Sequence, residues 1–184
     1  LVPGHDPNAD PYPSGPDGTG DLDKAKAKLT ECGQPNGFDL NLAYVNEGLG
    51  PKLFASMQQN LGRVGIKVNS APGEQSSYYT TFIGSPENVK AKKIGLAIAG
   101  WGADFPTPFG FWQSIANGNA IVPQGNSNYH SLDDPTINAA IDSLKTEGDR
   151  AKQAEIGKAI DAGVMAAAVY LPYQFDKTFY YRNP

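Results

Sequence analysis

A strand–helix–strand pattern occupies residues 38–72, FDLNLAYVNEGLGPKLFASMQQNLGRVGIKVNSAP. Its first part, 38–45, alternates apolar and polar residues as a half-buried strand does. A helix is predicted over about 49–64, because apolar residues recur there on one helical face: Leu49, Leu53, Met57, Leu61 and Val64. Gly65 ends this helix, and IKVNSAP begins a second strand. The pattern therefore predicts a βαβ unit with parallel strands and a right-handed crossover.

Further elements flank this unit on both sides. Residues 94–101, IGLAIAGW, are apolar on both faces, which favours a central strand of the sheet. A polar connection from Gly84 to Lys93 precedes this strand. The remaining predicted elements are helices over 21–32, 74–83, 109–117, 134–147 and 150–166, a loop over 118–132, and a last strand over 168–181.

This order of elements predicts the α/β class. We expect a three-layer lobe with a central mixed, mostly parallel sheet. Residues 1–20 contain five prolines and no apolar period, so we expect an extended Pro/Gly-rich arm there that enters from elsewhere in a longer protein. The predicted division is an arm over 1–20 and a ligand-binding lobe over 21–184.

The composition excludes several classes of function. The chain has 184 residues and a net charge of −4, and an acidic chain argues against nucleic acid as a partner. No stretch is apolar over the ~18 residues that span a bilayer. A single cysteine excludes an internal disulfide and a CxxC site. Two histidines, His5 and His130, leave little for zinc or for a catalytic triad, so no cofactor or metal is expected.

The turn GWGADFPTP, residues 100–108, is the candidate site, because ligands of parallel sheets bind beyond the carboxyl ends of the strands. Trp101 offers an aromatic face to an amine, and the Asp104 carboxylate can pair with an ammonium group. Gly100 and Gly102 would let a ligand backbone approach closely. The alternative is that Trp101 belongs to the core and Asp104 caps a tight turn before Pro106.

Other chemically suggestive residues have simpler explanations. Cys32 is expected to be a buried small apolar residue rather than a nucleophile. His130 lacks a companion nucleophile and carboxylate, and the adjacent acids Asp133 and Asp134 are explained by helix capping. The aromatic run Tyr78, Tyr79 and Phe82 is expected to be the packing face of the 74–83 helix, with a ligand platform as the alternative.

Four stretches of the chain carry a resemblance to a known family. They are DLDKAKAKLTECGQPNGFDLNLAY (21–44), FASMQQNLGRVGIKV (54–68), GWGADFPTPFGFW (100–112), and NYHSLDDPTINAAI (128–141) followed by DRAKQAEIGKAI (149–160). Together they resemble the C-terminal lobe of a family 5 extracellular solute-binding protein, the receptor of oligopeptide, dipeptide and nickel ABC importers. The resemblance covers nearly the whole chain, with Cys32 and Thr107 departing from the usual Ala and Asp.

The resemblance implies a fold and a binding role. The fold would be that of a type II periplasmic binding protein, in which two lobes close over a ligand. In peptide-binding members the Asp of the G-W-x-x-D motif holds the ammonium group of the peptide, and this position is Asp104 here. Gly100, Trp101 and Gly102 would run alongside the peptide backbone.

The expected function is that of the substrate-binding component of an ABC importer, without catalytic activity. The expected partners are a peptide or other small solute, the N-terminal lobe of the same protein, and an ABC permease. The expected location is extracellular or periplasmic, with the full-length protein anchored to the membrane as a lipoprotein. Two alternatives stay open: a peptide-signal receptor with the same fold and no transport role, and a hydrolase, which the absence of a nucleophile–base pair disfavours.

Overall fold

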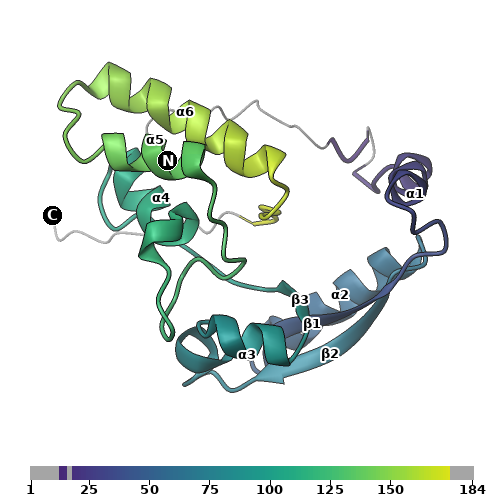
Figure 1. Ribbon diagram of the computed structural model, residues 1–184. Coiled ribbons are helices and arrows are strands. Elements are labelled where there is room, and N and C mark those ends of the chain that lie inside the picture. Colours follow the sequence, from purple (N-terminus) through teal and green to yellow (C-terminus); the bar gives the residue numbers. More distant parts are fainter. Residues whose placement is uncertain (1–12, 16–17, 175–184) are drawn as a thin grey trace, which may run out of the picture.

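The computed structural model describes residues 13–15 and 18–174. Helices and strands alternate as far as β3, and only helices and short helical turns follow it (Figure 1). In chain order the elements are α1 (Leu22–Glu31), β1 (Asp39–Val45), α2 (Gly50–Gly62), β2 (Lys67–Gly73), the π-helical turn η1 (Tyr78–Phe82), α3 (Pro86–Ala91), β3 (Ile94–Ala97), α4 (Pro108–Ala116), the 3₁₀ turn η2 (Gly118–Ala120), α5 (Pro135–Ser143) and α6 (Arg150–Ala166). The predicted βαβ unit is confirmed as β1–α2–β2.

The sheet has the strand order β2-β1-β3, and both strand pairs are parallel. In the β1–β2 pair, Asp39 lies opposite Lys67 and Val45 opposite Gly73. The α/β class predicted from the sequence is thereby confirmed.

The prediction of a central strand over 94–101 is wrong, because in the sheet that residues 18–174 form β1 occupies the centre and β3 lies at an edge. The described strand is also shorter and ends at Ala97, although the Ile98 amide still donates to the Ala43 carbonyl at 2.9 Å. A continuous apolar run indicates a strand in which apolar and polar residues do not alternate. It does not indicate whether that strand pairs with one other strand of the sheet or with two.

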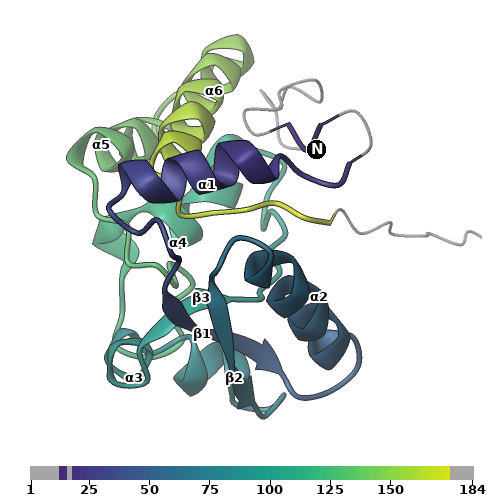
Figure 2. The ribbon, with the colours of Figure 1, turned by 90° about the vertical axis from the view of Figure 1, so that its right-hand side faces the viewer.

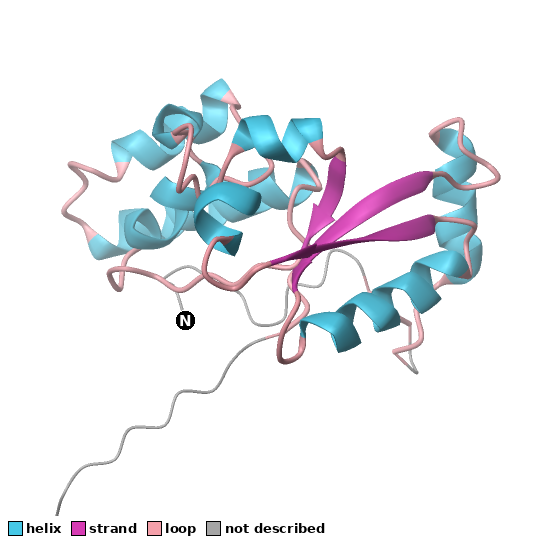
Figure 3. Cartoon of the chain, turned by 90° about the horizontal axis from the view of Figure 1, so that it is seen from below, coloured by secondary structure: helices cyan, strands magenta, loops and turns pink. Residues whose placement is uncertain are grey.

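Three layers form around the sheet. On one face α2 runs along the strands (Figure 3), and Phe54 of this helix stacks on Tyr44 of β1 at 4.9 Å between ring centroids. On the other face Ala43 of β1 packs with Tyr78 and Ile83 in a buried cluster. Successive residues of β1 thus serve opposite faces, as the pleat of a strand requires.

A second core lies among the last three helices, at the opposite end of the molecule from the sheet in Figure 1 and Figure 2. Its buried members come from α4, α5, α6 and the residues that follow α5: Trp112, Ile115, Ala116, Ile137, Ile141, Leu144, Ile160 and Val164. None of the described helices combines the length and apolar character needed to cross a bilayer.

The segment between β2 and β3 differs from the prediction. The expected helix over 74–83 is only the five-residue turn η1, and α3 lies inside the expected polar connection. The reason is local: the Ser85 hydroxyl accepts from the Asn88 amide at 3.4 Å, and Pro86 occupies the first turn of α3. Of the predicted last strand, residues 168–174 form no strand, and 175–181 lie outside the described residues.

Candidate functional site

The candidate turn is the connection between β3 and α4, which is also the link between the sheet and the helical core. The chain is tethered just before residues 100–108 and again within them. The Tyr78 hydroxyl donates to the Ile98 carbonyl at 2.8 Å, and the Asp104 amide donates to the Gly110 carbonyl at 3.0 Å. The turn is therefore held at fixed positions although it contains no helix or strand of its own.

Trp101 lies at the surface of this turn. Its side chain is 37% exposed, and its indole N–H donates to the Phe111 carbonyl at 3.2 Å. This contact fixes the ring at one edge and leaves part of it open to solvent. The alternative that Trp101 belongs to the core is therefore wrong.

Asp104 is exposed, and among the described residues its carboxylate accepts no hydrogen bond and forms no ion pair. The alternative that the Asp104 side chain caps a tight turn is therefore wrong, and the cap in this segment is Thr107, whose hydroxyl accepts from the Gly110 amide of α4 at 3.0 Å. Asp104 is also the only Asp, Glu, Lys or Arg between Lys93 and Asp133 in the sequence. A carboxylate without a partner in such a stretch is suited to a positively charged ligand group.

Gly100 and Gly102 flank Trp101 in open space. A Cβ atom added to either residue would meet no atom within 4 Å, and neither backbone has a positive φ. Neither packing nor backbone conformation in the described residues thus requires glycine at these positions. Their backbone groups are open to a ligand, which fits the close approach expected from the sequence.

Two tyrosines pack near the place where the chain leaves β3; Tyr79 belongs to the alternative of a ligand platform, and no role is predicted for Tyr129. Tyr79 was assigned to a packing face, yet it is 40% exposed, and its ring lies 6.2 Å from the ring of Tyr129. Tyr129 packs against the same buried cluster as Ala99, which begins the turn. The signal available in the sequence was the doubled tyrosine in SSYYTTF, of which only Tyr78 is buried in η1.

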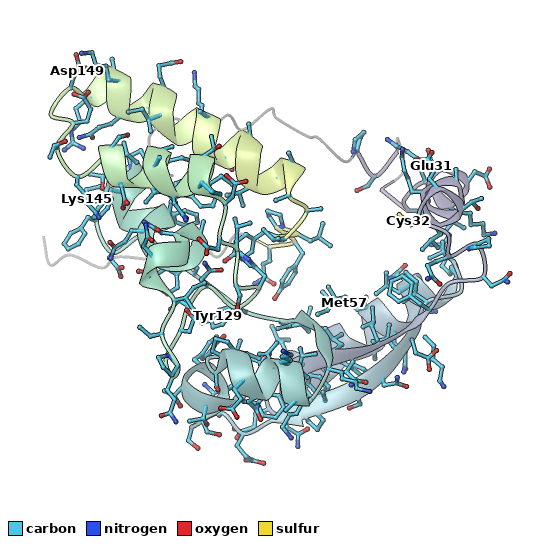
Figure 4. All side chains as sticks on the ribbon, in the orientation of Figure 1. Glu31, Cys32, Met57, Tyr129, Lys145 and Asp149 are labelled. Atoms are coloured by element: carbon cyan, nitrogen blue, oxygen red, sulfur yellow. The ribbon has the colours of Figure 1, made fainter. Side chains whose placement is uncertain are left out.

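The remaining chemically suggestive residues lie elsewhere. Cys32 is exposed at the end of α1 (Figure 4), so the prediction of a buried apolar residue is wrong. The reason is that α1 buries none of its side chains. Asp134 caps α5 as predicted by accepting from the Thr136 and Ile137 amides, whereas the Asp133 carboxylate accepts from the Asn138 side-chain amide at 2.7 Å. No group of three metal-binding side chains occurs among residues 13–15 and 18–174.

A surface hollow of about 420 Å³ adjoins the far end of the turn. It is lined by residues from the end of the turn, the start of α4, the α5–α6 connection and α6: Phe105, Thr107, Pro108, Phe109, Leu144, Lys145, Glu147 and Gln153. The hollow thus adjoins the second half of the turn, but Gly100, Trp101, Gly102 and Asp104 do not line it.

Comparison with solved structures places the fold among binding proteins. The clavulanic acid biosynthesis oligopeptide binding protein 2 is 37% identical over 91% of this chain, with a TM-score of 0.87. The periplasmic binding protein DppA from Helicobacter pylori, solved with the peptide STSA, is 23% identical over 89% of this chain, with a TM-score of 0.73. The murein tripeptide binding protein MppA is 17% identical over 91% of this chain, with a TM-score of 0.66.

The chain spans about 30% of the length of these three relatives, whose chains are covered to 30%, 29% and 30%. No curated protein matches it. The fold shared with these structures is that of the type II periplasmic binding proteins, as expected from the sequence. A model of the bacterial extracellular solute-binding proteins, family 5, matches residues 1–121, and the chain therefore belongs to this family.

Proposed function

We propose that residues 21–184 are the C-terminal lobe of a receptor that delivers peptides or related amine-bearing solutes to an ABC permease. Residues 1–20 would be the arm that enters from an N-terminal lobe, and the ligand would lie between the two lobes. The receptor would act outside the cytoplasm, anchored to the membrane, by binding alone and without catalysis. The family and the oligopeptide-binding relative at 37% identity support this role.

The observation that carries the proposal is the carboxylate of Asp104, which has no partner among residues 13–15 and 18–174 and lies on an open turn at the carboxyl end of β3. We assign it the ammonium group of the ligand. Trp101 would cover the aliphatic part beside that ammonium with its exposed ring edge, and Gly100 and Gly102 would let the ligand backbone reach the turn. Closure by the second lobe would remove water from the Asp104–ammonium pair and so strengthen it.

The test uses the full-length receptor and Asp104→Asn. Binding of Ala-Ala-Ala and of its N-acetyl derivative is measured by calorimetry, after a thermal-shift screen of free-amine tripeptides. Loss of one partner of a desolvated charge pair costs about 2–5 kcal/mol, so Asn should weaken free-amine binding strongly and spare the acetylated peptide. Asp23→Asn is the matched control, because Asp23 is an exposed acid in the first turn of α1.

Equal losses for the two peptides would show that Asp104 does not hold the amine. A receptor that binds no tripeptide in the screen would refute the peptide class itself.

A further inference from the structure

Tyr79 and Tyr129 come from segments fifty residues apart and form one aromatic surface. Tyr79 belongs to η1, and Tyr129 belongs to the loop between η2 and α5. Their rings are tilted by 44° with centroids 6.2 Å apart. Figure 4 shows Tyr129 between the helical core and the sheet, near the place where the chain leaves β3.

Backbone hydrogen bonds hold the two segments together. The Gly125 amide donates to the Thr80 carbonyl at 2.8 Å, and the Asn126 amide donates to the Gly84 carbonyl at 2.9 Å. The loop is further fixed by the buried side chain of Asn128, whose carbonyl oxygen accepts from the Leu132 amide at 2.9 Å. The aromatic surface therefore has a rigid support.

The position of this surface relative to the turn follows from Tyr78. Its buried ring packs edge-on against Tyr79 at 5.1 Å, and its hydroxyl holds the carbonyl of Ile98, three residues before Trp101. Ala99 and Tyr129 pack against the same buried cluster. Through Tyr78, this surface is thus connected to Ile98 and Ala99, where the chain leaves β3 and leads into the turn that carries Trp101 and Asp104.

Packing alone does not account for Tyr79. Tyr78 already fills the cluster below it, while Tyr79 leaves 40% of its surface to solvent. Burial raises the pKa of the Tyr129 phenol above its ordinary value. The surface consequently offers ring faces and phenol hydroxyls near the start of the connection that carries the Asp104 carboxylate, which suits an apolar or aromatic group attached to a cationic head.

We propose that Tyr79 and Tyr129 form a side-chain subsite of this binding site, which selects peptides carrying an aromatic or large aliphatic residue next to the amino-terminal residue. The inference rests on the proposed function, because it needs Asp104 to fix the ammonium end of the peptide. An aromatic contact contributes about 0.5–1.5 kcal/mol, which corresponds to a preference of about 2- to 13-fold.

The experiment measures the ratio of the affinities of the full-length receptor for Ala-Phe-Ala and Ala-Ser-Ala. We expect the wild type to prefer Ala-Phe-Ala, and Tyr79→Ala and Tyr129→Leu each to reduce that preference by about 2- to 13-fold. Phe38→Ala is the matched control: Phe38 is 41% exposed, like Tyr79, but lies just before β1, at the amino ends of the strands. Thermal melting confirms that each variant is folded.

The outcomes separate the two proposals. Asp104→Asn should weaken both peptides equally and leave their ratio unchanged. A wild type without preference, or a ratio that neither tyrosine variant changes while both are folded, would overturn the subsite and leave the amine clamp standing. An equal change with Phe38→Ala would also overturn it. Binding of neither peptide would overturn both proposals.

Discussion

Acidification should destabilise the chain through His130, which lies between the turn region and the helical core. The imidazole packs edge-on against Tyr170 at 4.5 Å, and its Nδ1 accepts from the Leu132 amide at 3.1 Å. Burial lowers the pKa of His130 from 6.5 to about 4, and a contact with the Ile115 carbonyl opposes this only in part. The folded state therefore prefers the neutral imidazole.

The sign and size of the effect follow from proton linkage. Between pH 6.5 and 4 the unfolded chain binds a proton at His130 that the folded chain does not, so stability is complete above pH 6.5 and falls as the pH falls. With these two pKa values, the loss between pH 7.5 and pH 5 is about 2 kcal/mol. Because solvent reaches the half-buried ring, we expect about 1 kcal/mol.

Urea unfolding at pH 7.5, 6.5, 5.5 and 5.0 measures this loss in the wild type and in His130→Asn. The amide of Asn can still accept from Leu132 but does not titrate, so the variant should be less dependent on pH over this range. Most carboxylates titrate below this window, and the pKa of Asp142, lowered by Lys145 and Asn117, places that group lower still. Identical pH dependence in the two proteins would refute the reasoning.

Four further outcomes are expected. Leu42 is 1% exposed, so Leu42→Ala should lower the free energy of unfolding, measured in urea, by about 2–5 kcal/mol. Met57 is only half-buried on α2, so Met57→Ala should lower it by clearly less. Asp134→Ala removes a cap with two hydrogen bonds and should cost about 1 kcal/mol, or a melting temperature lower by about 3 °C. Gly102→Ala should change stability by less than about 1 kcal/mol yet weaken peptide binding by the full-length receptor in calorimetry. Residues 1–184 alone should bind Ala-Ala-Ala at least about 1,000-fold more weakly than the full-length receptor, because one lobe leaves most of the ligand in water; equal affinities would contradict the two-lobe site.

The βαβ unit could be predicted because its information is local. The alternation over 38–45 and the helical period over 49–64 are both set by neighbours in the sequence. The order of the strands is not local, and for this reason the apolar run over 94–101 predicts a central strand although β3 lies at an edge of the described sheet. The caps of α3 show a further limit: Ser85 and Pro86 mark a helix start that the polar character of the segment concealed.

The candidate site was predictable to a similar degree. The residues of the turn follow from its place at the end of a strand, but the exposure of Trp101 depends on a contact with Phe111 of α4. Tyr79 and Tyr129 could not be paired from the sequence, because their contact depends on how the loop before α5 docks on η1. Cys32 was misassigned for a related reason, since the small residue ends a helix that buries no side chain.

The edge position of β3 has a consequence for handling the chain by itself. Among the described residues β3 pairs with β1 on one side only. The other side of β3 therefore has backbone amides and carbonyls that pair with no described strand, and its residues Gly95, Leu96 and Ala97 are exposed. No charged residue or proline lies within this short strand to discourage another strand from adding to it. Self-association through this edge should therefore grow with concentration, and a lysine at Leu96, which is 41% exposed, is the simplest change that would keep concentrated samples monomeric.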